Sequence, residues 1–387
     1  MRKLILLIFT VFILIPFSGC HTVSEYNNDS TDLNGKITIY DNNKALAEIE
    51  LFGNITQTND GFVYSKYTND SSEMEYYRFI FDTQKSIKLG SLKGWSFESN
   101  ETAYVNNHIY FLAATGEIAS YDDRTLKFME IDLNNNTMRE ISSEKGGFPY
   151  DTLEKANDSV LMTKVLQNGS CLEEYNTVSG ETKILKSFDF DDKNSIGEAI
   201  RKISVNEKDK TISLLMLKIT SEGDTSLYID TYDYDMNLLD TTDISSISED
   251  ENELAQGVSF FDCSNDCIFY ENFSITRFLG FINNGTLDEV GGIDESFEMS
   301  RKTAKDNETY LFYRFADSNN YIYLFNTKDK TMKKAAYKAE DDRYYITNMS
   351  CDENNNLFIF MNYKHPDTGE QLEPRVYYVK MDDLKFE

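Results

Sequence analysis

The chain is poor in the residues that most often build catalytic and metal sites. Among its 387 residues there are three His, one Trp, four Pro and five Cys. Nucleophilic catalysis needs a nucleophile beside a base, and His is the commonest base. No Gly-x-Ser-x-Gly turn and no Gly-rich phosphate-binding loop occurs in the sequence. We therefore expect no catalytic residues of the usual hydrolase type, no metal ion and no cofactor.

Positive charge is also scarce. The chain has 38 Lys and Arg against 66 Asp and Glu, which gives a net charge of −28. An acidic surface repels phosphate backbones, so nucleic acid is excluded as a partner. The simplest interpretation is a solvated acidic shell on an exported protein. Aromatic residues make up 13% of the chain, which is enough for a core, so the acidity does not indicate disorder.

The chain has one long apolar run, at its N-terminus. Arg2 and Lys3 precede apolar residues 4–17, a stretch too short to span a bilayer comfortably. The run ends in Phe-Ser-Gly-Cys at residues 17–20. This resembles the signal of bacterial lipoproteins, in which a small residue precedes an obligatory Cys.

The resemblance implies that residues 1–19 are a signal peptide and that Cys20 becomes a lipidated N-terminus. Acyl chains stabilise membrane binding by about 0.8 kcal/mol per buried methylene, so two or three of them anchor a protein firmly. Residues 20–34 are polar, which is typical of a flexible tether. We expect a lipid anchor on the extracytoplasmic face of the cell membrane. An ordinary secretory signal, cut elsewhere, is the alternative.

The four other Cys carry weaker signals. Cys263 and Cys267 flank a three-residue turn, and facing residues of a hairpin can meet the distance that a disulfide needs. An exported location permits such a bond. Cys171 and Cys351 lie in apolar strand patterns and are expected to be buried thiols. A Cys-x-x-x-Cys pair without a second Cys or His pair is poor evidence for zinc.

A repeat of about fifty residues organises the rest of the chain. Each unit has an Asn, Asp or Gly turn that leads into a strongly apolar strand, followed by a hairpin of a Tyr/Phe-rich strand and a charged strand. Several apolar strands lack alternation, which indicates burial on both faces. No stretch shows convincing helical periodicity. The apolar strands begin near Phe62, Ile109, Val160, Ile212, Ile268, Tyr310 and Leu357.

Two hairpins make a four-stranded unit, and a ring of such units is a β-propeller. We predict an all-β, seven-bladed propeller of four-stranded antiparallel blades over residues 35–387, with eight blades as the alternative. The last unit stops early, whereas residues 36–51 resemble a surplus outer hairpin. We therefore expect one or both N-terminal strands to close the ring. The architecture resembles the divergent propeller domains of bacterial surface lipoproteins, although Trp docking motifs are missing.

Two long loops between second and third strands are the candidate ligand rim. The first holds Tyr121, Asp123 and Arg124, and the second holds His365. Both combine rings with charges, which is the composition of a binding rim. The acidic segment 189–198 clusters oxygen ligands as a calcium loop does, but Lys193 occupies one ligand position, which favours a solvated loop.

These features favour a binding protein over an enzyme. We expect a monomeric, membrane-anchored binding or scaffolding propeller for a protein, peptide or glycan ligand. The alternative is a hydrolase or lactonase whose polar residues converge on the central channel. Such a site comes from scattered inner-strand residues and leaves no contiguous motif in the sequence. Fold analogy alone does not decide between the two.

Overall fold

The computed structural model describes most strands of the chain and many of the tight turns between them, from Ile39 to Glu387. No helix in the described ranges is long and apolar enough to cross a membrane. The residues outside the description are 1–38, 42–46, 49–51, 69–72, 94–95, 99–101, 116–124, 146–152, 167–168, 192–195, 246–257, 264–267, 274–276, 284–285, 290–297, 303–308, 317–318, 327–328, 330, 340–342, 352–355 and 364–373.

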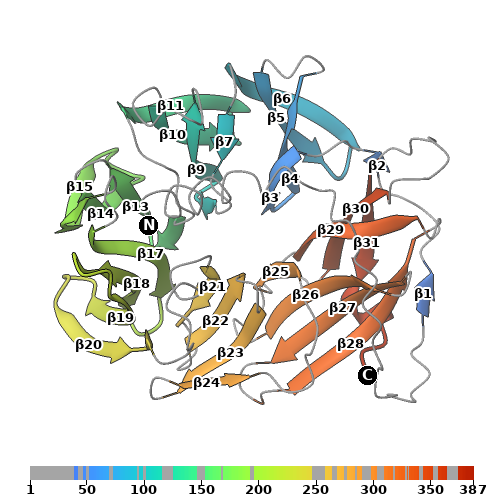
Figure 1. Ribbon diagram of the computed structural model, residues 1–387. Helices are drawn as coiled ribbons and strands as arrows, with labels where there is room; N and C mark the ends of the chain where they lie inside the picture. Colours follow the sequence, from blue (N-terminus) through green and yellow to red (C-terminus); the bar gives the residue numbers. More distant parts are fainter. Residues whose placement is uncertain are drawn as a thin grey trace.

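The described strands form seven sheets, numbered here in chain order (Figure 1). The first sheet contains β3 (Phe52–Thr58), β4 (Gly61–Tyr67), β5 (Glu73–Ile80) and β6 (Lys85–Lys93). The second contains β7 (Ser96–Glu98), β8 (Ala103–Val105), β9 (His108–Thr115), β10 (Thr125–Asp132) and β11 (Thr137–Lys145). The third contains β12 (Leu153–Ala156), β13 (Ser159–Leu166), β14 (Gly169–Asn176) and β15 (Thr182–Phe188).

The remaining sheets are similar, and two of them take in strands from the N-terminal segment. The fourth sheet contains β16 (Phe190–Asp191), β17 (Ile196–Asn206), β18 (Thr211–Ile219), β19 (Thr225–Asp233) and β20 (Leu238–Asp243). The fifth contains β21 (Val258–Asp262), β22 (Ile268–Phe273), β23 (Arg277–Asn283) and β24 (Thr286–Glu289). The sixth contains β25 (Glu298–Lys302), β26 (Thr309–Ala316), β27 (Asn319–Asn326), β28 (Thr331–Lys338) and β1 (Ile39–Asp41). The seventh contains β29 (Tyr344–Cys351), β30 (Asn356–Tyr363), β31 (Arg375–Lys380) and β2 (Ala47–Glu48).

The sheets follow one another around a ring (Figure 1). The predicted apolar strands are β4, β9, β13, β18, β22, β26 and β30. Each is the second strand of its sheet in chain order when the short strands β1, β2, β8 and β16 are left aside, and it is called the second main strand. Helix is almost absent from the described residues, as predicted, and the one helical element among them is the 3-10 turn η3 (Met381–Asp383).

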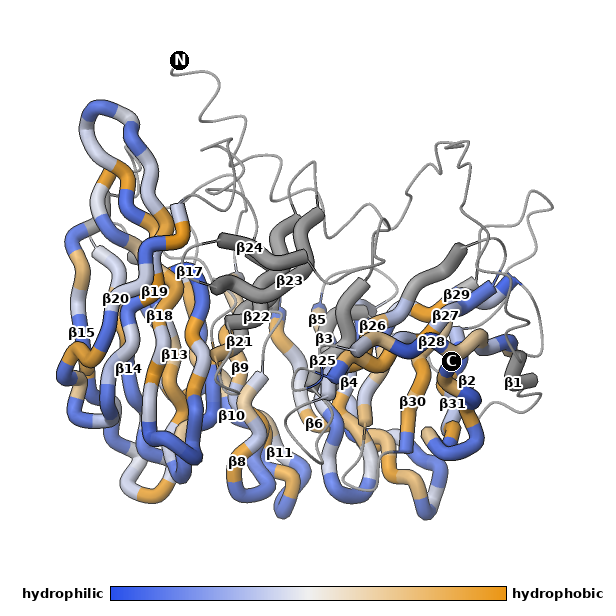
Figure 2. Tube along the Cα trace, turned by 90° about the horizontal axis from the view of Figure 1, so that it is seen from below, coloured by the Kyte–Doolittle hydropathy of each residue, from blue (hydrophilic) through white to orange (hydrophobic). Residues whose placement is uncertain are grey.

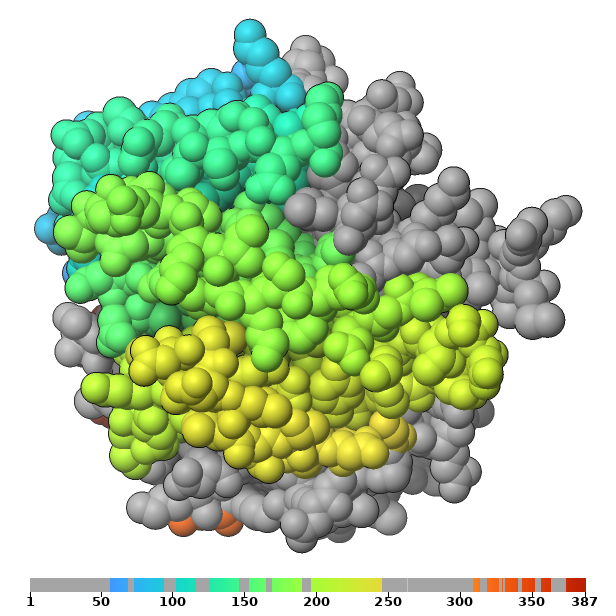
Figure 3. All heavy atoms as spheres, turned by 90° about the vertical axis from the view of Figure 1, so that its left-hand side faces the viewer, coloured from blue at the N-terminus to red at the C-terminus, as the bar shows by residue number. Residues whose placement is uncertain are grey.

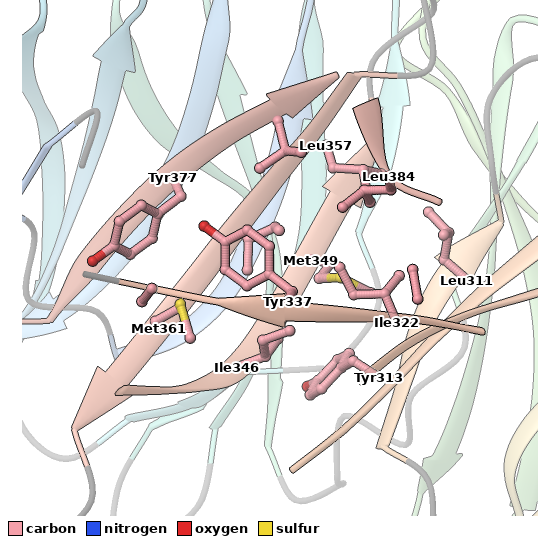
Figure 4. Close-up of a cluster of buried hydrophobic side chains, with 14 of the residues drawn as sticks. Leu311, Tyr313, Ile322, Tyr337, Ile346, Met349, Leu357, Met361, Tyr377 and Leu384 are labelled. Atoms are coloured by element: carbon pink, nitrogen blue, oxygen red, sulfur yellow. The ribbon is translucent and has the colours of Figure 1, made fainter. Parts of the chain in front are cut away.

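The apolar strands β9 and β30 are buried on both faces because their sheets are packed between two others. On β9, Ile109 and Phe111 pack against the first sheet, whereas Tyr110 and Leu112 pack against the third. The same alternation occurs on β30. Figure 4 shows the cluster between the sixth and seventh sheets, in which Leu357 of β30 lies near Leu384, and Met361 lies at the Tyr377 end. This explains why these strands are apolar without alternation.

The ring has two edges with different connections. Tight turns between first and second strands and between third and fourth strands lie at one edge, the turn edge. Figure 2 shows such hydrophilic turns beside β8 and β11. Asn106, Asn107 and Asn136 adopt φ of 51°, 64° and 53° there, which Asn tolerates better than most residues. The second-to-third-strand loops and the connections between sheets lie at the opposite edge, the loop edge.

The first and seventh sheets meet through side chains. Phe62 of β4 makes an edge-to-face contact with Phe360 of β30, with ring centroids 5.0 Å apart. Ser350 of β29 donates to Gln57 Oε1 of β3 at 2.6 Å. The N-terminal strands pair with the outer strands of two sheets: β2 pairs antiparallel with β31 of the seventh sheet over two residues, and β1 pairs in parallel with β28 of the sixth over three.

Candidate functional site

The predicted ligand rim lies outside the described residues. Tyr121, Asp123 and Arg124 fall between β9 and β10, and His365 falls between β30 and β31. Their role stays a prediction. The second main strand of the fourth sheet, β18, ends at the loop edge, beside the pocket described below.

Two of the five cysteines, Cys171 and Cys351, lie in described strands. Cys20 and Cys267 lie outside the described residues, so the lipid attachment and the disulfide with Cys263 stay predictions. Cys171 is a buried thiol, as expected, and burial together with the nearby Glu173 raises its pKa to about 11. Cys351 is half-buried rather than buried, because β29 is the innermost strand of the seventh sheet and is less covered than the strands behind it.

A pocket of about 450 Å³ opens between the third and fourth sheets at the loop edge. Figure 3 shows these two sheets side by side on one face of the molecule. The pocket lies where the chain crosses from the last strand of one sheet to the first strands of the next. Its lining comes from the end of β15, the crossover, the start of β17 and the end of β18, namely Ser187, Phe188, Asp189, Gly197, Glu198 and Lys218.

The local sequence explains why the pocket is polar while the interface between the two sheets below it, the seam, is apolar. On β18, the side chains of Ile212, Leu214 and Met216 belong to the apolar cluster that fills the seam. Lys218 comes two residues after Met216, so its side chain lies on the same face of β18, closer to the loop edge. Glu198 of β17 is its direct cross-strand neighbour. The seam therefore changes from a hydrophobic core to a charged pocket within two residues.

Glu198 is held from several sides. Its carboxylate forms an ion pair with Lys218 Nζ at 2.9 Å, and the carboxylate charge is close enough to the Tyr228 hydroxyl on β19 to raise the pKa of that tyrosine. Its backbone N–H donates to the carbonyl of Asp189 at 2.9 Å. Burial, followed by the charges of Glu198 and Asp230, raises the pKa of Tyr228 well above its usual value, so the hydroxyl stays a donor at physiological pH. The backbone of Glu198 is consequently anchored at the pocket, with the carboxylate beside a cation.

A second polar layer lies deeper in the same seam. Asp230 is buried and accepts hydrogen bonds from Tyr232 at 2.8 Å and from Thr241 at 2.7 Å. Lys186 of β15 places its ammonium 4.0 Å from the ring centroid of Tyr232. Such a cation–π contact contributes about 0.5–2 kcal/mol, depending on its exposure. It ties the outer strand of the third sheet to the fourth sheet and fixes the width of the seam.

A second group of charges links strands within the second sheet. Glu130 is buried, pairs with Arg139 Nε of β11 and accepts from the Tyr110 hydroxyl at 3.1 Å. His108 has its Nε2 3.6 Å from Asp132 Oδ1 and its Nδ1 2.8 Å from the Asn106 carbonyl. Glu130 and Arg139 satisfy each other's charge at the outer part of the sheet.

The buried Lys164 forms a third group. Its ammonium lies 2.5 Å from Glu144 of the second sheet and 2.7 Å from Glu173 of its own sheet. Burial alone would lower the pKa of Lys164, but the hydrogen bonds and charges of the two carboxylates outweigh it and raise the pKa. This group connects two neighbouring sheets.

The calcium interpretation of segment 189–198 receives no support from the part that can be described. Among the described residues, no group of three or more His, Cys, Asp and Glu could hold a metal ion. Asp189 contributes its carbonyl to the β-hairpin hydrogen bond with Glu198, and Glu198 pairs with a lysine. Sequence reasoning found this acidic segment but missed its partners, because Lys218 and Tyr228 are at least 20 residues further along the chain.

Comparisons with known proteins identify the fold. No protein-family model and no curated protein matches the sequence. The β-propeller domain of the Trilobed protease from Pyrococcus furiosus matches with a TM-score of 0.52 at 10% identity, covering 87% of this chain and 95% of that one. The polysaccharide lyase Uly1 matches with a TM-score of 0.50 at 9% identity, covering 91% and 93%. The chain therefore has a divergent β-propeller fold, and at these identities the likeness concerns the fold alone.

Proposed function

We propose that this protein is a lipid-anchored, extracytoplasmic binding propeller. Each of the seven sheets is one blade of the ring, and β2 supplies the outer strand that the seventh sheet lacks. Cys20 carries the lipid, and the polar segment 20–34 holds the propeller off the membrane. The ligand is a protein, peptide or glycan outside the cell membrane.

The observation that carries the proposal is the pre-organised pocket at the loop edge. The charged side chains of the pocket are held by neighbouring residues even without a ligand. Binding therefore requires little further ordering of these side chains. Phe188 supplies an apolar wall, and Asp189, Glu198 and Lys218 supply polar groups that converge on the same space. A few fixed polar groups around a partly apolar hollow are typical of ligand sites. The predicted rim loops would extend this surface around the same edge.

Export and anchoring are tested by labelling cells with radioactive palmitate. We expect the wild-type protein to take up the label and to fractionate with membranes, and Cys20→Ala to lose both properties. A Cys20→Ala protein that is still acylated and membrane-bound would contradict the anchor. Binding itself is tested separately, so that failure of one part leaves the other standing.

Peptide and glycan arrays test the pocket. The wild type should give discrete hits, and Glu198→Gln should lose them. Glu181→Gln is the matched control, because this exposed carboxylate lies in the β14–β15 turn at the opposite edge. Hits that survive Glu198→Gln would place the ligand elsewhere. Chemical conversion of a bound hit would instead favour the hydrolase or lactonase alternative.

A further inference from the structure

The pocket already binds an ammonium group that belongs to the protein. Lys218 Nζ lies 2.9 Å from Glu198 Oε1, and the two side chains are 49% and 35% exposed. Ion pairs with this exposure contribute little, because both partners are well hydrated when they separate. Lys218 is attached through four flexible carbons and can leave the pocket at small cost.

Glu198 behaves differently from its partner. Its backbone is fixed by the hydrogen bond to the Asp189 carbonyl, and its carboxylate charge is close enough to the Tyr228 hydroxyl to raise the pKa of that tyrosine. When Lys218 leaves, the anchored backbone of Glu198 keeps its carboxylate at the pocket. Asp189 also lines the pocket and adds a second acidic residue to its lining.

The chain as a whole favours positive ligands. The net charge of −28 concentrates cations near the surface and speeds their encounter. The Glu198 carboxylate in the pocket is paired with an ammonium group that can move away. It therefore suits a ligand that also carries an ammonium group.

We propose that the pocket binds the primary ammonium group of a ligand, and that Lys218 is an internal competitor that must be displaced. This inference rests on the proposed binding function and adds the class of ligand. A lysine side chain of a peptide and a free polyamine share this chemistry. The ligand's ammonium takes the place of Lys218 Nζ on Glu198, while Asp189 and Phe188 contact the rest of the molecule.

The test is calorimetric titration of the full-length protein in detergent with two probes, Nα-acetyl-lysine methylamide and spermidine. We expect Lys218→Met to tighten binding by up to about fivefold, since it removes the competitor and keeps the apolar stem. Glu198→Gln should weaken binding at least about tenfold. Nα,Nε-diacetyl-lysine methylamide, which lacks the charge, should not bind.

The two probes distinguish the sources: tighter binding of the lysine derivative indicates a peptide, and tighter binding of spermidine indicates a polyamine. Lys218→Met that weakens binding, or leaves it unchanged, overturns the competitor role. Thermal melting of each variant shows whether it is folded. If neither probe binds but array hits still depend on Glu198, the ammonium inference fails and the proposed binding function stands.

Discussion

At the scale of single residues, buried charges stabilise the junctions between and within blades. Lys164 is 4% exposed and contacts two carboxylates, one of them on the neighbouring sheet. Asp230 in the next seam is satisfied by two hydroxyl groups. Each buried charge has a partner, because an unpaired one would cost several kcal/mol. These side chains also fix which face of each strand can meet its neighbour.

Removal of one partner from the Lys164 group should be strongly destabilising. We expect Lys164→Met to lower the free energy of unfolding by about 3–5 kcal/mol, because Glu173 is left buried without its cation. Urea unfolding at pH 7 measures this. Lys164→Met combined with Glu173→Leu should recover much of the loss. A single substitution that costs under about 1 kcal/mol would contradict this account.

The same lysine gives a dependence on pH. Because its folded-state pKa is raised above 10.5, its contribution to stability is fully present below that pH and is lost as the pH rises through the folded-state pKa. Lys164→Met should lack this component of the alkaline loss.

At the scale of elements, tight packing of backbone against backbone restricts the hairpins. Gly61 begins β4 and pairs with Ile80 of β5. A Cβ at this position would lie 1.8 Å from the carbonyl oxygen of Phe79, so only glycine fits without a shift of the strand. In the turns before β9 and β11, Asn residues at positive φ allow the chain to reverse tightly.

Gly61→Ala should therefore separate β4 from β5 locally. We expect a loss of about 3 kcal/mol, at the upper end of the usual cost of overpacking, measured by urea unfolding. Gly169→Ala is the matched control, since its nearest atom, the Phe188 carbonyl oxygen, lies 3.3 Å from the added Cβ. It should cost about 1 kcal/mol. Equal losses for the two substitutions would contradict the steric explanation.

At the scale of the whole molecule, side-chain packing rather than backbone pairing joins the two ends of the ring. Among the residues that the structure describes, the backbone pairing at this junction consists of two residue pairs between β2 and β31. The aromatic cluster between the first and seventh sheets is larger, and it includes Phe62, Tyr64, Phe79, Phe358 and Phe360. Stacking of Phe81 on Phe358, with ring centroids 4.1 Å apart, extends it outward.

Phe360→Ala should destabilise the ring more than a break in the β2 ladder. We expect about 3–5 kcal/mol for Phe360→Ala and about 1 kcal/mol for Ala47→Pro, measured by denaturant unfolding. Phe62→Ala combined with Phe360→Ala should cost less than the two single losses together, because the rings contact each other. If Ala47→Pro proves as costly as Phe360→Ala, the backbone pairing dominates instead.

Several features of the fold were predictable because they depend on local patterns. Apolar strands without alternation predicted burial on both faces, and β9 and β30 have it because each lies between two sheets. Asn-rich turns predicted tight hairpins, because Asn tolerates positive φ. The candidate site was less predictable: the acidic segment 189–198 could be found in the sequence, but its partners could not.

The sequence by itself determined the period, the strand types and the turns, since these follow from residues that are neighbours along the chain. Only the tertiary structure decided which charges meet. Glu198 pairs with Lys218 and lies close to Tyr228, and Lys164 reaches Glu144, because strand register and the stacking of one sheet on the next bring them together. The division of the N-terminal segment between the sixth and seventh sheets was decided in the same way, because it depends on which outer edges are free once the ring has formed.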